Sequence, residues 1–146
     1  MPNRAVIKVI QNRDFLVSTP EKSVRAVAVH MKQNAAAATL VVDAKKGRLI
    51  GICTERDLAF KVLAEGLDPL TTPVSAVMTE DPQSVGPEML FGHALHLMYE
   101  GGFRHMPVVD PIGRPIGLIS ARDALGLEML GFCQELEQRE TLTEIM

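Results

Sequence analysis

Two short stretches of the sequence carry the same pattern of polar groups. The stretch "GICTERDL" runs from Gly51 to Leu58, and "GLISARDA" runs from Gly117 to Ala124. Each contains a glycine, two apolar residues, a hydroxyl, one variable residue and then Arg-Asp. A hydroxyl followed three residues later by an acid has the spacing of a capping box, which starts a helix. The same groups could also form a ligand site built on that helix start.

The candidate polar groups are a hydroxyl, an arginine and an aspartate in each stretch. A helix start presents free N–H groups and a partial positive charge, which suits an anion. An arginine in the first helical turn is mildly unfavourable against that charge. A bound phosphate, the adjacent acid or a partner chain could compensate, and the alternative is a solvated surface side chain. The residues are Thr54, Arg56, Asp57, Ser120, Arg122 and Asp123.

The elements that must position these groups come from an internal repeat. An offset of 67 residues places Pro20-Glu21 on Pro87-Glu88 and one "VVD" on the other. The turn "AKKGR" is one residue longer than "PIGR", so the offset then becomes 66 and the two Arg-Asp pairs coincide. A one-residue change in a surface turn is typical of a duplication. Two copies of one structural unit are therefore expected.

Each copy is predicted to contain strand, helix, strand, strand and helix. "FLVS" and "QSV" are short extended entries, and the proline after each is expected at the first helical position. "TLVVD" and "MPVVD" are predicted buried strands, each followed by a glycine-containing turn and a second hairpin strand. The hydroxyl then begins the last helix, which Gly66 ends in the first copy. One unit alone would be marginal, so two α+β units should pack with approximate two-fold symmetry and form two related clefts.

Composition limits the class of protein. The chain has 146 residues, 47% of them hydrophobic and 23% charged, which suits one compact body. The net charge of −3 argues against a nucleic-acid surface, which needs clustered basic side chains. This charge is uneven, because the first 73 residues carry +4 and the other 73 carry −7. Cys53 and Cys133 lack disulfide or zinc spacing. Without an apolar leader or membrane-length run, a cytoplasmic protein without membrane contact is expected.

These features together resemble a pair of CBS domains, the regulatory module named after cystathionine beta-synthase. The resemblance rests on "FRHMPVVD", the following turn, "GLISARDAL" and the tandem arrangement, and it covers roughly residues 7–134. It implies two tandem β-α-β-β-α repeats packed with pseudo-two-fold symmetry, a Bateman-type module, here expected to stand alone. The predicted units are repeat 1 (7–67), a connector (68–77), repeat 2 (78–134) and a helical tail (135–146).

The resemblance also implies which residues bind. CBS pairs commonly bind AMP, ADP, ATP, NAD or S-adenosylmethionine as regulatory ligands, and no cofactor is required. The aspartates Asp57 and Asp123 would hold ribose hydroxyls, since a carboxylate accepts two hydrogen bonds. Repeat 1 departs from the pattern, because 35–38 are alanines where repeat 2 has a polar pair. The implied contacts at base, ribose or phosphate are Thr54, Ser120, Arg104, His105, Met106 and Pro107, and the glycines Gly51 and Gly117 are expected to let the backbone approach a flat base.

Two functions from different classes remain open. One is a non-catalytic signal-transduction module whose ligand occupancy reshapes a homodimer and alters contacts with a target protein. The other is a structural dimerisation adaptor with empty or vestigial clefts. An enzyme is not expected, because the sequence offers no nucleophile–base pair, glycine-rich phosphate loop or full metal set. The histidines His93 and His96 are expected as partly exposed helix residues without a metal. An apolar stripe on the last helix could form a dimer contact or pack onto its own domain: Leu125, Met129, Phe132 and Leu136.

Overall fold

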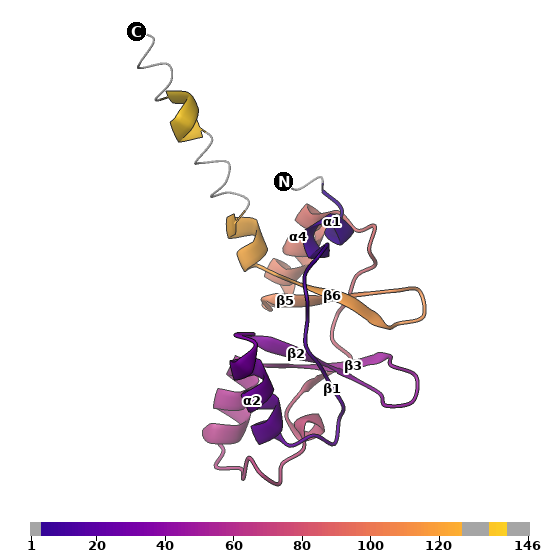
Figure 1. Cartoon of the computed structure of the whole chain (residues 1–146), viewed down its shortest axis with the longest axis vertical. Coiled ribbons are helices and arrows are strands. Elements are labelled where there is room, and N and C mark those ends of the chain that lie inside the picture. Colours follow the sequence, from indigo (N-terminus) through magenta and orange to yellow (C-terminus); the bar gives the residue numbers. More distant parts are fainter. Residues whose placement is uncertain (1–3, 127–134, 140–146) are drawn as a thin grey trace.

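The computed structural model describes residues 4–126 and 135–139. Figure 1 shows two α+β halves stacked along the long axis of the molecule. The elements are, in chain order, α1 (Val6–Ile10), β1 (Val17–Ser18), α2 (Val24–Gln33), β2 (Ala38–Val42), β3 (Leu49–Thr54), α3 (Glu55–Asp57), the π-helical η1 (Leu58–Leu63), the 3-10 turn η2 (Val74–Ala76), β4 (Thr79–Glu80), α4 (Phe91–Gly101), β5 (His105–Val109) and β6 (Pro115–Ser120). Residues 122–126 and 135–139 are also helical.

Repeat 1 is built on a four-stranded sheet in the order β1-β2-β3-β4. The β1 and β2 strands are parallel, and β3 is antiparallel to both β2 and β4. Helix α2 begins after Ser23, whose hydroxyl accepts a hydrogen bond from the Ala26 amide at 3.1 Å. The prediction that Pro20 and Pro87 occupy the first helical position is wrong. Both precede their helix by three or more residues, because the chain turns before each helix begins.

Repeat 2 uses the hairpin of β5 and β6, extended by a parallel bridge between Val85 and Val108. The expected entry strand at 83–85 is therefore reduced to one bridged residue. Helix α4 and the N-terminal helix α1 cover this hairpin, as the upper half of Figure 1 shows. The Val6 amide donates to the Met89 carbonyl at 2.8 Å. The sequence patterns did not predict helix α1. Although α1 precedes the strands of repeat 1 in the chain, it packs on repeat 2 and completes its core.

The segment after repeat 1 completes that repeat in turn. The Val74 amide donates to the Lys22 carbonyl at 2.7 Å, and β4 pairs with β3. Val74 and Val77 are buried in the same cluster as the helix residue Val27. The stretch predicted as a connector, 68–77, therefore contributes Val74 and Val77 to the core of repeat 1, although it forms no more than the short 3-10 turn η2.

The two repeats meet through apolar side chains on the inner faces of their strands. Leu40 and Ile52 are buried at this junction, and Leu118 from repeat 2 packs against them. The Leu49 amide also donates to the Gly113 carbonyl at 2.9 Å, which ties the two hairpins together. The tandem α+β arrangement with approximate two-fold symmetry is confirmed.

Several remaining predictions concern packing. Cys53 is fully buried, and this burial raises the pKa of its thiol to about 12, so it remains protonated at neutral pH. No helix in the described ranges has the length and apolar character needed to cross a bilayer. Leu125 and Leu136 are 59% and 42% exposed, respectively. The other stripe positions, Met129 and Phe132, and the second cysteine, Cys133, lie outside the described residues.

Candidate functional site

The predicted residues of repeat 2 lie at the adjoining ends of β5 and β6. His105 is the register partner of Ser120, and the Ala121 amide donates to the Arg104 carbonyl at 2.9 Å. Met106 and Pro107, next along β5, are buried. Antiparallel pairing brings the start of one strand beside the end of the other. This pairing brings His105, the candidate contact to the base, beside the hydroxyl residue Ser120, although the two are 15 residues apart in the chain.

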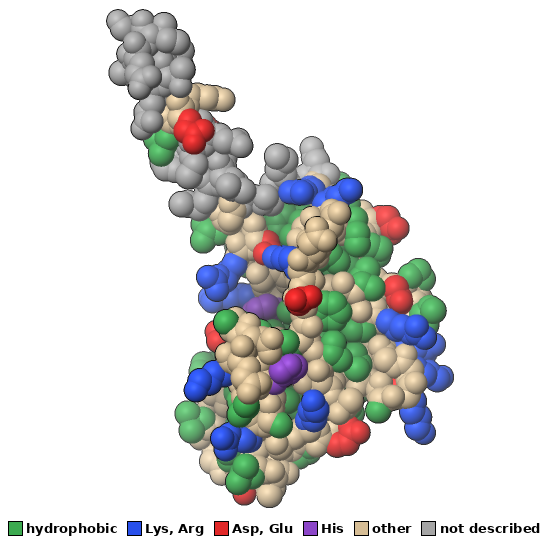
Figure 2. Space-filling view, in the orientation of Figure 1, with side chains coloured by type: hydrophobic (Ala, Val, Ile, Leu, Met, Phe, Trp, Pro, Cys, Tyr) green, Lys and Arg blue, Asp and Glu red, His purple; other side chains and the backbone are tan. Residues whose placement is uncertain are grey.

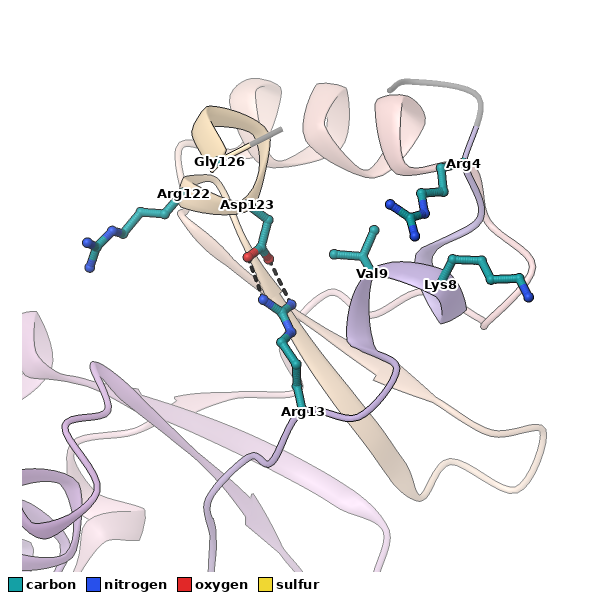
Figure 3. Close-up of a pocket in the computed structure, with 7 residues that line it drawn as sticks. All are labelled: Arg4, Lys8, Val9, Arg13, Arg122, Asp123 and Gly126. Atoms are coloured by element: carbon teal, nitrogen blue, oxygen red, sulfur yellow. Dashed lines mark hydrogen bonds and ion pairs between the residues drawn. The ribbon is translucent and has the colours of Figure 1, made fainter. Parts of the chain in front are cut away.

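Asp123 completes this group but already has partners within the chain. Its Oδ2 accepts a hydrogen bond from the Ser120 amide at 2.8 Å, which is one half of the predicted capping box. The Arg13 guanidinium binds the same carboxylate through both nitrogens, at 2.6 and 3.0 Å. Figure 3 shows this bidentate pair between the helix start and the segment that follows α1. The Arg13 Nη2 atom also lies 3.3 Å from the Leu118 carbonyl.

Asp57 is held entirely by groups of repeat 1. Its Oδ2 accepts hydrogen bonds from the Thr54 amide at 2.9 Å and the Thr54 hydroxyl at 3.2 Å. The Asp57 amide donates back to that hydroxyl, so the capping box is complete. The Lys61 ammonium lies 3.0 Å from Asp57 Oδ1 and donates to the Val77 carbonyl. Asp57 therefore caps its helix and forms an ion pair one turn away.

The two repeats differ in the cation that faces the aspartate. At the 66-residue offset, Lys61 corresponds to Leu127, so the second helix has no lysine at that position. At the 67-residue offset, Arg13 corresponds to Glu80, which cannot pair with an aspartate. Repeat 1 therefore supplies its cation from its own helix. Repeat 2 takes its cation from a segment more than 100 residues earlier.

The three arginines of the predicted site, Arg56, Arg104 and Arg122, lie on the surface. The Arg56 guanidinium lies 5.0 Å from the centre of the Phe60 ring, in a cation–π contact. This contact is a compensation for the first-turn arginine that the sequence analysis did not consider. Arg104 and Arg122 are exposed. In Figure 3 the Arg122 side chain extends away from Asp123.

His105 is half-buried, and this burial lowers its pKa below the ordinary value of about 6.5. The carboxylates of Glu55 and Asp123 oppose that shift, while Arg104 adds to it. Glu55 belongs to the helix start of repeat 1, so the charge that acts on His105 comes partly from the other repeat. At neutral pH the imidazole is therefore neutral, and it can both donate and accept a hydrogen bond.

The free energy of unfolding is expected to fall as the pH drops below about 6.5, because the unfolded chain then binds a proton that folded His105 resists. The contribution of His105 to stability is fully present above its pKa in the unfolded chain, and it is lost as the pH falls toward its lower pKa in the folded protein. Urea unfolding of the wild type and His105→Gln at pH 7.5, 6.5 and 5.5 measures this. For His105→Gln, the free energy of unfolding should fall less steeply as the pH drops, with the slope reduced by the equivalent of up to one proton. Equal slopes of stability against pH for the two proteins would contradict a lowered pKa of His105.

The two motif glycines do not leave space for a flat base. A Cβ at Gly117 would lie 2.5 Å from Ile10 Cδ1, and a Cβ at Gly51 would overlap the sulfur of Met78. The expectation that these glycines admit a base is therefore wrong. Side chains of the two crossing segments, α1 and the stretch before β4, already occupy the space. The glycines allow those segments to pack closely on the hairpins.

The histidine pair lies on the exposed surface of α4. His96 Nε2 lies 3.0 Å from Glu100 on the helix surface, with both side chains exposed. Within residues 4–126 and 135–139, no cluster of three or more potential metal ligands is present.

Sequence reasoning missed Arg13 and the cavity beside it. This open cavity of about 390 Å³ lies between α1 and the helix start at Asp123. Its lining residues are Arg4, Lys8, Val9, Arg13, Arg122, Asp123 and Gly126. The available signal was the apolar spacing of Val6 and Ile10 between basic residues, which is typical of an amphipathic helical turn.

Two packed β-α-β-β-α units, each with a polar helix start near their junction, define a tandem CBS-type pair. The model of the CBS domain matches residues 7–64 and 74–129, and the chain belongs to this family. CBS-domain pairs are generally regulatory, signal-transduction modules.

Comparisons with known proteins agree with this assignment. A CBS-domain protein assigned to signal transduction, from Burkholderia ambifaria MC40-6, is 31% identical with a TM-score of 0.75, covering 84% of this chain and 91% of that one. An uncharacterized protein from Methanopyrus kandleri is 30% identical over 119 residues, which are 82% of this chain and 60% of the relative. The chain thus spans about 60% of that curated relative's length. The CBS domain pair of protein MJ0100, solved with 5′-methylthioadenosine and S-adenosyl-L-methionine, has a TM-score of 0.77 at 22% identity, with 86% and 96% coverage, and shows the shared fold.

Proposed function

We propose that the chain is a non-catalytic regulatory module that binds adenosine-containing ligands at the junction of its repeats. AMP, ADP and ATP are the principal candidates, with NAD and S-adenosylmethionine as further ones. The convergence of His105, Ser120 and Asp123 at the repeat 2 strand ends supports this most directly. Asp123 can accept both ribose hydroxyls once Arg13 moves, and neutral His105 can bond to a base. The ligands bound by the MJ0100 pair favour the adenosine class.

Ligand occupancy would act through a homodimer and a separate target protein. A ligand shifts an equilibrium only by its differential affinity for two arrangements. The Arg13–Asp123 pair provides such a difference, because ribose binding and this ion pair compete for one carboxylate. Release of Arg13 would free the segment that connects α1 on repeat 2 with β1 on repeat 1. The exposed Leu125 and Leu136 side chains are candidates for the dimer contact.

A thermal-shift panel tests the proposal. AMP, ADP, ATP, NAD, S-adenosylmethionine and 5′-methylthioadenosine should be titrated against the full chain. A ligand at 100 times its Kd stabilises the folded state by about 2.7 kcal/mol, so the Tm must rise with concentration. The expected result is a rise with at least one adenosine ligand and none with a pyrimidine nucleoside. No shift with any adenosine ligand, confirmed by calorimetric titration, would remove the binding function.

The second candidate is a dimerisation adaptor with vestigial clefts. Two observations favour it: both aspartates have cations within the chain, and the repeat 1 strand entry is alanine-rich. The adaptor proposal expects a dimer by sedimentation equilibrium whose dissociation constant does not change with adenosine ligands. The regulatory proposal expects that constant, or the dimer's shape by small-angle scattering, to change when ligand is added.

A further inference from the structure

We infer that the segment preceding repeat 1 forms a polyphosphate subsite for the repeat 2 cleft, so that ADP and ATP are preferred over AMP and over uncharged adenosine ligands. The inference deepens the proposed function and rests on it for the adenosine part of the ligand. The phosphate part rests on the cavity between α1 and the helix start at Asp123.

The charge of this cavity is the first argument. Four basic side chains line it, against the single carboxylate of Asp123, which gives a net charge of +3. Asp123 is already neutralised by Arg13. In the described residues, no acidic side chain forms an ion pair with Arg4, Lys8 or Arg122. Like charges around one hollow repel one another, and a multiply charged anion would relieve that repulsion.

The geometry of the side chains is the second argument. In Figure 3 the Arg4 guanidinium reaches toward the hollow above Val9, while Arg13 enters from the opposite side. Lys8 and Arg122 lie at the rim with their charged ends turned outward, so they are the adaptable members of the set. Planar guanidinium groups bind phosphate oxygens in a bidentate manner, which favours arginine at the two inner positions.

Asp123 connects this cavity with the adenosine candidates. The same carboxylate lines the cavity, bonds to the Ser120 amide and acts on His105. A ligand whose ribose occupied Asp123 would displace the Arg13 guanidinium, which lies beside the cavity and could then pair with a phosphate. Arg13 would thus exchange one anion for another, and its charge would never be left unpaired. A ligand without phosphates offers no such exchange.

The decisive variant is Arg4→Gln/Lys8→Gln, which removes two cavity charges and leaves Arg13 and Asp123 in place. The matched control is Lys45→Gln/Lys46→Gln, with the same charge change on the exposed turn between β2 and β3. Figure 2 shows basic side chains gathered in both regions, beside α1 and on the hairpin turns. Calorimetric titration of the full chain would use ATP, ADP, AMP, 5′-methylthioadenosine and inorganic tripolyphosphate, at two salt concentrations.

The wild type is expected to bind ATP at least about tenfold more tightly than AMP, and 5′-methylthioadenosine most weakly. The Arg4→Gln/Lys8→Gln variant should lose about tenfold for ATP, leave 5′-methylthioadenosine unchanged and reduce the salt dependence of ATP binding. The hairpin variant should match the wild type. Equal affinities of the wild type for all adenosine ligands, or equal loss in both variants, would overturn the subsite and leave the proposed function standing.

Tripolyphosphate separates the two failures. If no adenosine ligand binds but tripolyphosphate does, and Arg4→Gln/Lys8→Gln abolishes that binding, the anion site stands and the adenosine function fails. If neither class of ligand binds the wild type, both are overturned. Circular dichroism and urea unfolding of each variant confirm that an altered affinity is measured on a folded protein.

Discussion

Replacing Asp123 with asparagine is expected to weaken adenosine-ligand binding by about 10- to 100-fold, the loss associated with a hydrogen bond to a charged group. The amide keeps one acceptor oxygen but loses the charge and the second acceptor needed for two ribose hydroxyls. The free energy of unfolding should fall by less than about 1 kcal/mol, because the Arg13–Asp123 pair is partly exposed, with 41% of the Arg13 side chain accessible. Calorimetric titration and urea unfolding measure the two effects separately.

The matched variant is Asp57→Asn, and its expected profile is the reverse. Asp57 is 9% exposed and accepts hydrogen bonds within a complete capping box, so its replacement should cost about 1 kcal/mol of stability. Its effect on ligand affinity should be smaller, since the strand entry of repeat 1 lacks the polar pair of repeat 2. If Asp123→Asn lowers stability but leaves the intrinsic affinity unchanged, Asp123 is a helix cap and not a ribose holder.

Replacing Gly117 with alanine is expected to cost about 1–3 kcal/mol of stability, the usual penalty for overpacking. The new Cβ would lie 2.9 Å from the Ile10 Cβ, an atom that rotation about side-chain bonds cannot move. Helix α1 must therefore shift away from β6. Because Arg13 follows this helix by three residues, the shift should also disturb its pair with Asp123.

Gly86→Ala is the control for that substitution, because its Cβ would meet nothing nearer than Glu88 Oε2 at 3.9 Å. Urea unfolding of both variants, with the midpoint and slope fitted separately, gives the difference in stability. We expect Gly86→Ala to remain within about 0.5 kcal/mol of the wild type, as is usual for uncrowded surface positions. Equal midpoints for the two variants would mean that α1 does not pack closely on Gly117.

The repeat was predictable because its signals are local. The first strand of each hairpin, β2 or β5, lies within one residue of the predicted "TLVVD" or "MPVVD", because "VVD" followed by a glycine turn marks the end of the strand. The fully formed box at Thr54 and Asp57 likewise depends on four adjacent residues. Gly66 has φ +68°, a left-handed conformation that favours glycine, but η1 already ends at Leu63, so Gly66 lies in the turn that follows the helix.

The features that sequence reasoning missed depend on contacts between distant segments. Arg13 and Asp123 are 110 residues apart in the chain, and no local sequence spacing predicts an ion pair between them. The glycine error had the same origin: Gly117 does indicate a close approach, but nothing near it in the sequence identifies Ile10 as the neighbour. Pro20 was misplaced because Ser23, which precedes the true start of α2, is an equally valid start signal. Helix α4 begins after Leu90, which makes no side-chain cap bond, so no such residue marked its start after Pro87.

The exchange of flanking segments between the repeats has a consequence for folding. Val6 and Ile10 are buried in repeat 2, whereas Val74 and Val77, which precede that repeat, are buried in repeat 1. Cutting the chain between the two copies would remove core side chains from at least one half. The halves should therefore melt in one cooperative transition, with equal calorimetric and van't Hoff enthalpies. Hydrogen exchange in α2, far from the repeat 2 cleft, should then slow when a ligand occupies that cleft.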